Sequence, residues 1–213
     1  MALFMEKYEK RGVVEVMFDD RSRLKIRKKD YEAYPLEKDE DIDLEEYENK
    51  ICAFQAPEAY EAALSLLDYS ARTESEIRKK LLMKGYLLPV IESVIERLKE
   101  ARLVDDRQLA ERIAENASVR GLGTYALKRK LKVRGIGEED VEYASSLMDE
   151  ESEKEGAKKE AARLFRKYVK LQARDAKSKL SQALSRRGYS WDAVSEAIDY
   201  IFKDDFLDDS DFE

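Results

Sequence analysis

Three near-copies of one short motif recur along the chain, roughly fifty residues apart. The copies are RKKLLMKGY at residues 78–86, KRKLKVRGI at 128–136 and SQALSRRGY at 181–189. Relative to the glycine of each copy, apolar residues recur eight and four positions before it, and six and thirteen positions after it. These offsets put an apolar seam on one face of two helices that flank the glycine. The seam residues are Ile77, Leu81, Ile91 and Leu98, then Leu127, Leu131, Val141 and Met148, then Leu180, Leu184, Val194 and Ile201.

Each copy therefore predicts a unit of three helices. We expect first helices at 58–70, 106–118 and 152–172, second helices at 74–84, 124–134 and 176–187, and third helices at 89–101, 138–149 and 191–203. The glycine ends the second helix in a left-handed conformation, and the cation before it (Lys84, Arg134 or Arg187) faces the negative end of the helix dipole. Units of this length cannot each bury a full core, so they are expected to stack.

The predicted fold is mainly α, an elongated, curved array of three tandem three-helix repeats with a small N-terminal α+β unit. The repeats are expected at residues 57–104, 105–150 and 151–203, the N-terminal unit at 1–56 and an acidic tail at 204–213. In the N-terminal unit, two runs of alternating apolar and polar residues flank an Asp-Asp-Arg-Ser turn, which predicts a β-hairpin over 12–29. We expect strand only within about residues 12–28, and a short helix near 51–54, closed by Pro57.

Composition removes several classes of enzyme. The chain has no histidine and therefore lacks both the commonest general base and the commonest metal ligand, while its one cysteine, Cys52, cannot form an internal disulfide. The stretch GLGTYA at 121–126 matches a dinucleotide-binding turn, but no strand precedes it, which favours a turn between helices. The aspartates at 39–43 lack the glycine and glutamate of a calcium loop. We expect no catalysis, cofactor or metal.

Charge is distributed unevenly along the sequence. The net charge is −7, yet residues 157–203 carry 12 basic and 5 acidic groups, and residues 204–213 carry 6 acidic groups and no basic one. Two basic triplets, at residues 78–80 and 128–130, lie in mid-helix, where the helix dipole no longer acts. Since three consecutive residues span about 200° of a helix surface, at least one residue of each triplet must face a neighbour or a partner. A row of cations is also expected to form a one-sided stripe along the first helix of the third repeat.

These cations are the candidate contact residues. They are either a solvated helix face or contacts with an anionic partner, such as DNA phosphate or an acidic protein groove. In the first two repeats they are Arg78, Lys79, Lys80, Lys128, Arg129, Lys130 and Lys132. In the third repeat they are Lys159, Arg163, Arg166, Lys167, Lys170 and Arg174.

The segment ARLVDDRQLAERIAENASVRGLGTYALKRKLKVRGI, residues 101–136, resembles the RecX family, regulators of the bacterial RecA recombinase. The likeness lies in a Leu-Val-Asp-Asp block, a glycine-containing turn and a Lys/Arg-Gly ending in that order, and it extends over about residues 60–203. Leu109 stands where the family commonly has an aromatic residue, the third repeat is diverged, and residues 1–56 match no shared pattern.

The resemblance implies a non-enzymatic, mainly inhibitory regulator of RecA. Such a protein would bind in the groove of the RecA–DNA filament and modulate filament growth, ATP hydrolysis and strand exchange in recombination and DNA repair. We also expect a monomer. Since the sequence has a single cysteine and no long apolar segment, we expect a cytoplasmic protein that does not bind membranes. Two alternatives remain: a protein that binds DNA directly through helix-turn-helix-like pairs, and a scaffold that joins other proteins.

Overall fold

The computed structural model describes residues 1–204, apart from the side chains of Ser118 and Asp204. The chain divides into two compact units, which adjoin in sequence between Asp105 and Asp106. The described residues form ten helices and four strands. The prediction of a mainly α protein with tandem three-helix repeats and a small N-terminal α+β region is confirmed, whereas the elongated, curved form and the domain limits stay predictions.

A four-stranded antiparallel sheet occupies the N-terminal region, in the order β3-β2-β1-β4. Its elements are β1 (Ala2–Lys10), β2 (Val13–Phe18), β3 (Arg23–Arg27) and β4 (Asp41–Ile42), and α1 (Lys28–Ala33) follows β3. The expected hairpin is present as β2 and β3, in which Val14 lies opposite Ile26.

The expectation that strand would be confined to residues 12–28 is wrong, because β1 and β4 extend the sheet. Only Ala2 and Phe4 of the β1 side chains are buried, so this strand lacks the apolar–polar alternation by which a half-buried strand is recognised. It is joined to β2 by a tight turn in which Arg11 and Gly12 both have positive φ, 52° and 79°. That geometry suits the twist of a hairpin.

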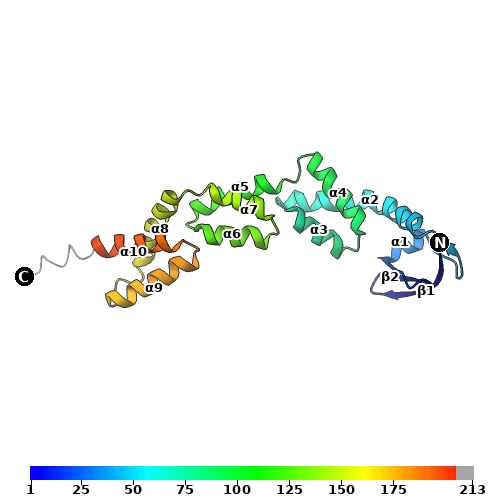
Figure 1. Cartoon of the computed structure of the whole chain (residues 1–213), viewed down its shortest axis with the longest axis horizontal. Coiled ribbons are helices and arrows are strands. Elements are labelled where there is room, and N and C mark those ends of the chain that lie inside the picture. The colour runs from blue at the N-terminus through cyan, green and yellow to red at the C-terminus, as the bar shows by residue number, and fades with distance from the viewer. Residues whose placement is uncertain (205–213) are drawn as a thin grey trace, which may run out of the picture. The chain divides into compact units, whose positions relative to one another are not determined.

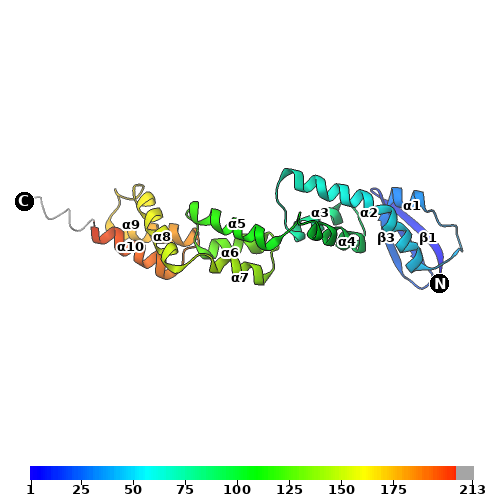
Figure 2. The same ribbon diagram turned by 90° about the horizontal axis from the view of Figure 1, so that it is seen from above.

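Helix α2 (Leu44–Tyr69) continues through Pro57 and contributes to two cores. Ile51 packs with the sheet, and Ala63 packs with the first repeat. The expected short helix that ends at Pro57 is therefore wrong. A proline in a helix interior costs about 3 kcal/mol, and burial on both sides of it offsets that cost. Figures 1 and 2 show α2 passing from the sheet to α3 and α4.

Each repeat contains three helices and has its own buried cluster. The first repeat combines the end of α2 with α3 (Glu74–Met83) and α4 (Leu88–Glu100). The second contains α5 (Asp106–Val119), α6 (Thr124–Val133) and α7 (Glu138–Ser146). The third contains α8 (Glu150–Phe165), α9 (Ala173–Arg186) and α10 (Trp191–Asp204).

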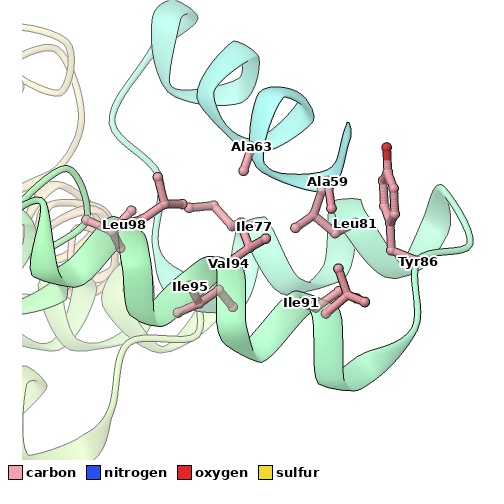
Figure 3. Close-up of a cluster of buried hydrophobic side chains, with 11 residues drawn as sticks. Ala59, Ala63, Ile77, Leu81, Tyr86, Ile91, Val94, Ile95 and Leu98 are labelled. Atoms are coloured by element: carbon pink, nitrogen blue, oxygen red, sulfur yellow. The ribbon is translucent and has the colours of Figure 1, made fainter. Parts of the chain in front are cut away.

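The apolar seam read from the sequence forms the cores of the repeats. Leu81, Leu131 and Leu184 are each fully buried. Figure 3 shows the first of these clusters, to which α2 contributes Ala59 and Ala63, α3 contributes Leu81 and α4 contributes Ile91.

The glycine of each repeat ends the second helix in the same hydrogen-bonded turn. In the first copy Gly85 has a φ of 83°, and its amide donates to the carbonyl of Leu82 (2.9 Å). The amide of Tyr86 donates to the carbonyl of Leu81 (3.3 Å). The same pair of bonds follows Leu131 and Leu184, so all three helices end in a Schellman motif, as the sequence predicts.

In the first unit, polar side chains join the sheet region to the first repeat. Asp30 is fully buried and accepts hydrogen bonds from Arg27 Nε (2.8 Å) and from Gln55 Nε2 (2.6 Å). Gln55 Oε1 accepts from the amide of Leu87 (2.8 Å), in the turn that follows α3. The guanidinium of Arg27 lies over the ring of Tyr86, 4.3 Å from its centroid. One buried carboxylate therefore organises this junction.

In the second unit, repeats two and three meet through their backbones. The amide of Gly123 donates to the carbonyl of Arg187 (3.0 Å), and the amide of Tyr125 donates to the carbonyl of Gly188 (2.9 Å). A Cβ on Gly123 would lie 2.4 Å from the carbonyl oxygen of Gly188, and one on Gly188 would lie 2.1 Å from the amide nitrogen of Ala126. The stretch GLGTYA is thus a turn between helices, as expected, and its second glycine permits this close approach.

Candidate interaction surfaces

The first residue of each mid-helix basic triplet forms an ion pair within its own repeat. Arg78 on α3 donates from Nε and Nη2 to Glu92 on α4, at 2.6 and 2.8 Å. Lys128 on α6 donates to Glu142 on α7 at 2.7 Å. Arg78 holds the pKa of Glu92 below its usual value, mainly through these hydrogen bonds. These two cations therefore join the second helix of each repeat to the third. This agrees with the expectation that at least one member of each triplet faces a neighbour or a partner.

The other two residues of each triplet point into solvent. Lys79 and Lys80 on α3, and Arg129 and Lys130 on α6, are all exposed. Within residues 1–204, none of the four forms an ion pair with a carboxylate. A cation without an internal partner can bind an external anion without first breaking a bond in the protein. Of the first-repeat and second-repeat candidates, these four are the best placed for contact.

Exposed apolar side chains flank these cations on the same helix faces. Tyr125 and Val133 are 65% and 82% exposed and lie four residues before and after Arg129. On α3, Met83 is 73% exposed and lies four residues after Lys79. Residues four apart on a helix are surface neighbours. Each face therefore offers both charge and apolar area, the combination on which protein contacts rely.

The expected basic stripe from residue 159 to residue 174 is wrong, because the first helix of the third repeat ends at Phe165 rather than near 172. Beyond it the chain makes tight turns, in which the amides of Lys167 and Tyr168 bond the carbonyls three residues earlier (3.0 and 2.7 Å). Phe165 packs edge-on against Phe202 of α10, 5.5 Å between ring centroids, which holds this turn to the core. No glycine or proline marks the turn in the sequence.

The six third-repeat candidates are therefore distributed over three segments. Lys159 is exposed on α8, and Arg163, also on α8, donates to Glu160 at 2.9 and 2.6 Å. Arg174 is the second residue of the next helix, α9. The remaining three, in the connecting turns and all exposed, are Arg166, Lys167 and Lys170. In the second repeat, Lys132 forms an ion pair with Glu138 on the exposed surface, with 2.8 Å between Nζ and Oε1.

Arg187 does more than cap its helix. Its Nε lies 2.7 Å from Oε1 of Glu160, a buried carboxylate, and its Nη1 donates to the carbonyl of Gly121 at 3.4 Å. A second buried carboxylate, Glu153, accepts from the amide of Thr124 at 2.9 Å, at the start of α6. Sequence reasoning missed both carboxylates, since glutamates in a helix dense with charge carry no distinguishing signal.

The described residues contain no sign of a membrane span or a metal centre. No helix among residues 1–204 is long and apolar enough to cross a bilayer. The same residues contain no group of three or more side chains able to hold a metal ion.

Family models of RecX match the chain in two places. The model of the first three-helix domain matches residues 59–98, and that of the third three-helix domain matches residues 151–198. Both matches fall on repeats that the structure forms as separate three-helix units. Fold and match together define a protein of tandem three-helix domains.

Known proteins and structures agree with these matches. A "Regulatory protein RecX" from Limosilactobacillus reuteri is 29% identical over 212 residues, which cover 98% of this chain and 78% of that protein. A crystal structure of regulatory protein RecX has a TM-score of 0.63 and 26% identity, covering 96% of this chain and all (100%) of that one. RecX from Lactobacillus salivarius has a TM-score of 0.65 and 26% identity, covering 70% of this chain and 97% of its own. The chain belongs to the RecX family of regulatory proteins.

Proposed function

We propose that this protein is a non-enzymatic regulator, mainly an inhibitor, of a RecA recombinase. It binds as a cytoplasmic monomer in the groove of the RecA–DNA filament and restrains filament growth, ATP hydrolysis and strand exchange in recombination and DNA repair. Membership of the RecX family carries this proposal. The exposed cations of α3 and α6 support it, because they are free to pair with an anionic partner.

Repetition of the contact faces suits a filament. The exposed pair on α3, Lys79 and Lys80, and the pair on α6, Arg129 and Lys130, occupy the same places relative to their glycines. A filament likewise repeats its binding surface along its length. Several weak contacts on one chain act together, because after the first has formed the others bind at high effective concentration. Each contact is screened by salt, so the affinity falls as ionic strength rises.

Direct reading of DNA by helix pairs is the weaker candidate. In a helix-turn-helix, the second helix of the pair enters the major groove with its first turn toward the bases. Here that position belongs to α4 and α7, and the first turn of α7 carries Glu138, Glu139 and Asp140. Three carboxylates there repel phosphate.

Binding to naked single-stranded DNA and to RecA-coated DNA, compared at physiological salt, tests the proposal. We expect much tighter binding to the coated DNA than to either component alone, together with suppression of ATP hydrolysis at less than one protein per RecA. Equal affinity for naked and coated DNA would instead identify a DNA-binding protein. Binding without any change in ATP hydrolysis or strand exchange would identify a scaffold.

Charge reversal separates contact residues from structural ones. Changing Lys79, Lys80, Arg129 and Lys130 together to Glu should abolish inhibition of strand exchange. The melting temperature should hardly change, because exposed substitutions usually alter stability by less than about 0.5 kcal/mol. A matched control reverses four exposed cations off these two faces: Lys10, Arg21, Lys38 and Arg112. Equal loss of inhibition in both variants would show that overall charge, and not these faces, determines binding.

A further inference from the structure

The third repeat has two serines at the positions where an ion pair joins the second and third helices of the other two repeats. In the first two repeats an ion pair joins the second helix to the third, Arg78–Glu92 in one and Lys128–Glu142 in the other. The basic residue stands seven positions before the repeat glycine, and the acidic residue stands seven positions after it. At the same offsets from Gly188 the chain has Ser181 and Ser195, whose short side chains cannot meet across the space. Both serines line a groove of about 370 Å³ between α9 and α10.

The lining of this groove combines apolar and basic groups. Trp191, Val194 and Ile198 of α10 form its apolar part, and Arg174 and Lys177 of α9 supply cations. Trp191 is 78% exposed, unusually so for the largest apolar side chain. The groove is therefore shaped for an apolar side chain that has acidic neighbours.

Lys177 has only a loose internal partner. Its Nζ lies 3.9 Å from Asp199, and both side chains are about half exposed, at 56% and 53%. A pair at that distance between exposed groups contributes little. Lys177 can therefore exchange Asp199 for another carboxylate at small cost.

We propose that residues 205–213 of this same chain bind in the groove. This segment, DFLDDSDFE, has five acids, no base and three large apolar residues, Phe206, Leu207 and Phe212. One of the aromatic rings packs against Trp191, while neighbouring carboxylates pair with Arg174 and Lys177. The charges are complementary, since residues 157–203 carry 12 basic and 5 acidic groups.

The distances along the chain permit this contact. Ile198 stands six residues before the last residue of α10, which is about 9 Å of helix. The nine residues of the segment span about 30 Å when extended. The segment can therefore turn back and reach the whole groove. Because it is tethered, its effective concentration at the groove is in the millimolar range, so a weak contact suffices.

Trp191 is the only tryptophan in the sequence and reports directly on the groove. The test compares the full chain with a chain that ends at Lys203, by tryptophan emission and by acrylamide quenching. We expect the full chain to emit at shorter wavelength and to be quenched less. About 1 M salt, where the Debye length is about 3 Å, should bring the two closer together. A peptide of residues 204–213 should restore the shift to the shorter chain.

Two further variants make the outcome specific. Ser181→Arg with Ser195→Glu rebuilds the ion pair of the other repeats and closes the groove, so its emission should be the same with and without residues 204–213. A peptide in which Phe206 and Phe212 are replaced by Ser keeps every charge and should fail to restore the shift. Identical emission and quenching of the full and shortened chains would overturn the proposal. A shift that grows with protein concentration would also overturn it, since the occupant would then be a second copy. No recombinase is present, so this result is independent of the proposed function.

Discussion

The sheet region meets the first repeat, and the second repeat meets the third, at the same kind of turn but through different contacts. In each case the turn follows a capped second helix, and the preceding part of the chain packs against it. The turn contains Gly85 and Tyr86 in the first repeat, and Gly188 and Tyr189 in the third. At Gly85 the neighbour is a side chain, with Arg27 Cγ 2.9 Å from where a Cβ would be. At Gly188 the neighbour is backbone, which no rotamer change can move away. The first junction depends on side-chain contacts. The second also has side-chain contacts, from Arg187 to Gly121 and from Glu153 to Thr124, but it requires that Gly188 carry no side chain.

Loss of the buried carboxylate should weaken the first junction most. Asp30→Ala leaves the guanidinium of Arg27, a side chain that is only 10% exposed, without its main partner. Removing one member of a buried ion pair costs about 3–5 kcal/mol. The expected result is a loss of that size in the free energy of unfolding, measured by urea denaturation.

Glu58→Gln is the matched control for that change. Glu58 also pairs with Arg27, at 3.1 Å, but its side chain is 48% exposed. Its loss should cost at most about 1 kcal/mol. If both variants lose the same small amount, Asp30 does not organise the junction.

Alanine at the glycines tests the second junction. Gly188→Ala places a methyl group on the backbone of the second repeat and also strains a φ of 80°, so we expect a loss of about 2–4 kcal/mol. Gly85→Ala has the same strain, at a φ of 83°, but meets only a flexible arginine stem, so about 1–2 kcal/mol is expected.

Gly123→Ala isolates the close approach. It has no positive φ, yet its Cβ would lie 2.4 Å from the backbone of Tyr189. A loss of about 1–3 kcal/mol is expected from overpacking alone. Urea denaturation of all three alanine variants checks the order. Equal losses at Gly85 and Gly188 would mean that backbone strain determines the cost at both glycines. The close backbone contact at Gly188 would then add nothing to it.

The tyrosines of the two turns predict a smaller difference, visible at alkaline pH. Burial raises the pKa of Tyr189 to about 12 from the usual 10.0, and among the described residues its hydroxyl has no hydrogen-bond partner. Since the unfolded tyrosine releases its proton first, the stability it contributes is complete below pH 10 and is lost as pH rises toward 12.

Tyr189→Phe should therefore keep stability near neutral pH, or raise it by up to about 1 kcal/mol, because an unpaired buried hydroxyl is removed. It should also flatten the loss of stability above pH 10. Tyr86→Phe should show a smaller effect, because Arg27 over the ring opposes the burial that raises the pKa of Tyr86. Melting temperatures at neutral and alkaline pH check both. A steeper alkaline loss in Tyr189→Phe would contradict the assignment.

The parts of the fold that the sequence predicts are those set by local periodicity. Leu81, Leu131 and Leu184 recur with the helical period, and the glycines that follow them need a left-handed conformation whatever surrounds them. The errors at β1, at Pro57 and after Phe165 have another origin. There the structure is decided by contacts with residues distant in sequence, such as the pairing of β1 with β2 or the packing of Phe165 on Phe202.

For the candidate contact residues, too, local spacing predicts one part of the outcome and contacts between distant residues decide the rest. Helical spacing is enough to place Lys79 and Lys80 away from the buried seam. It does not show that Arg78 and Lys128 pair with acids fourteen residues later, although a glutamate at the same offset in both repeats was an available signal. Their roles in binding stay predictions, as do those of the third-repeat cations.

Helix α2 has a consequence for how the N-terminal half of the protein folds. Since one continuous helix supplies Ile51 to the sheet core and Ala63 to the core of the first repeat, neither core can lose it alone. The sheet region and the first repeat should therefore melt as a single cooperative transition. Such coupling makes the sheet an obligatory part of the first repeat's folding, so it cannot be exchanged or deleted as an independent module.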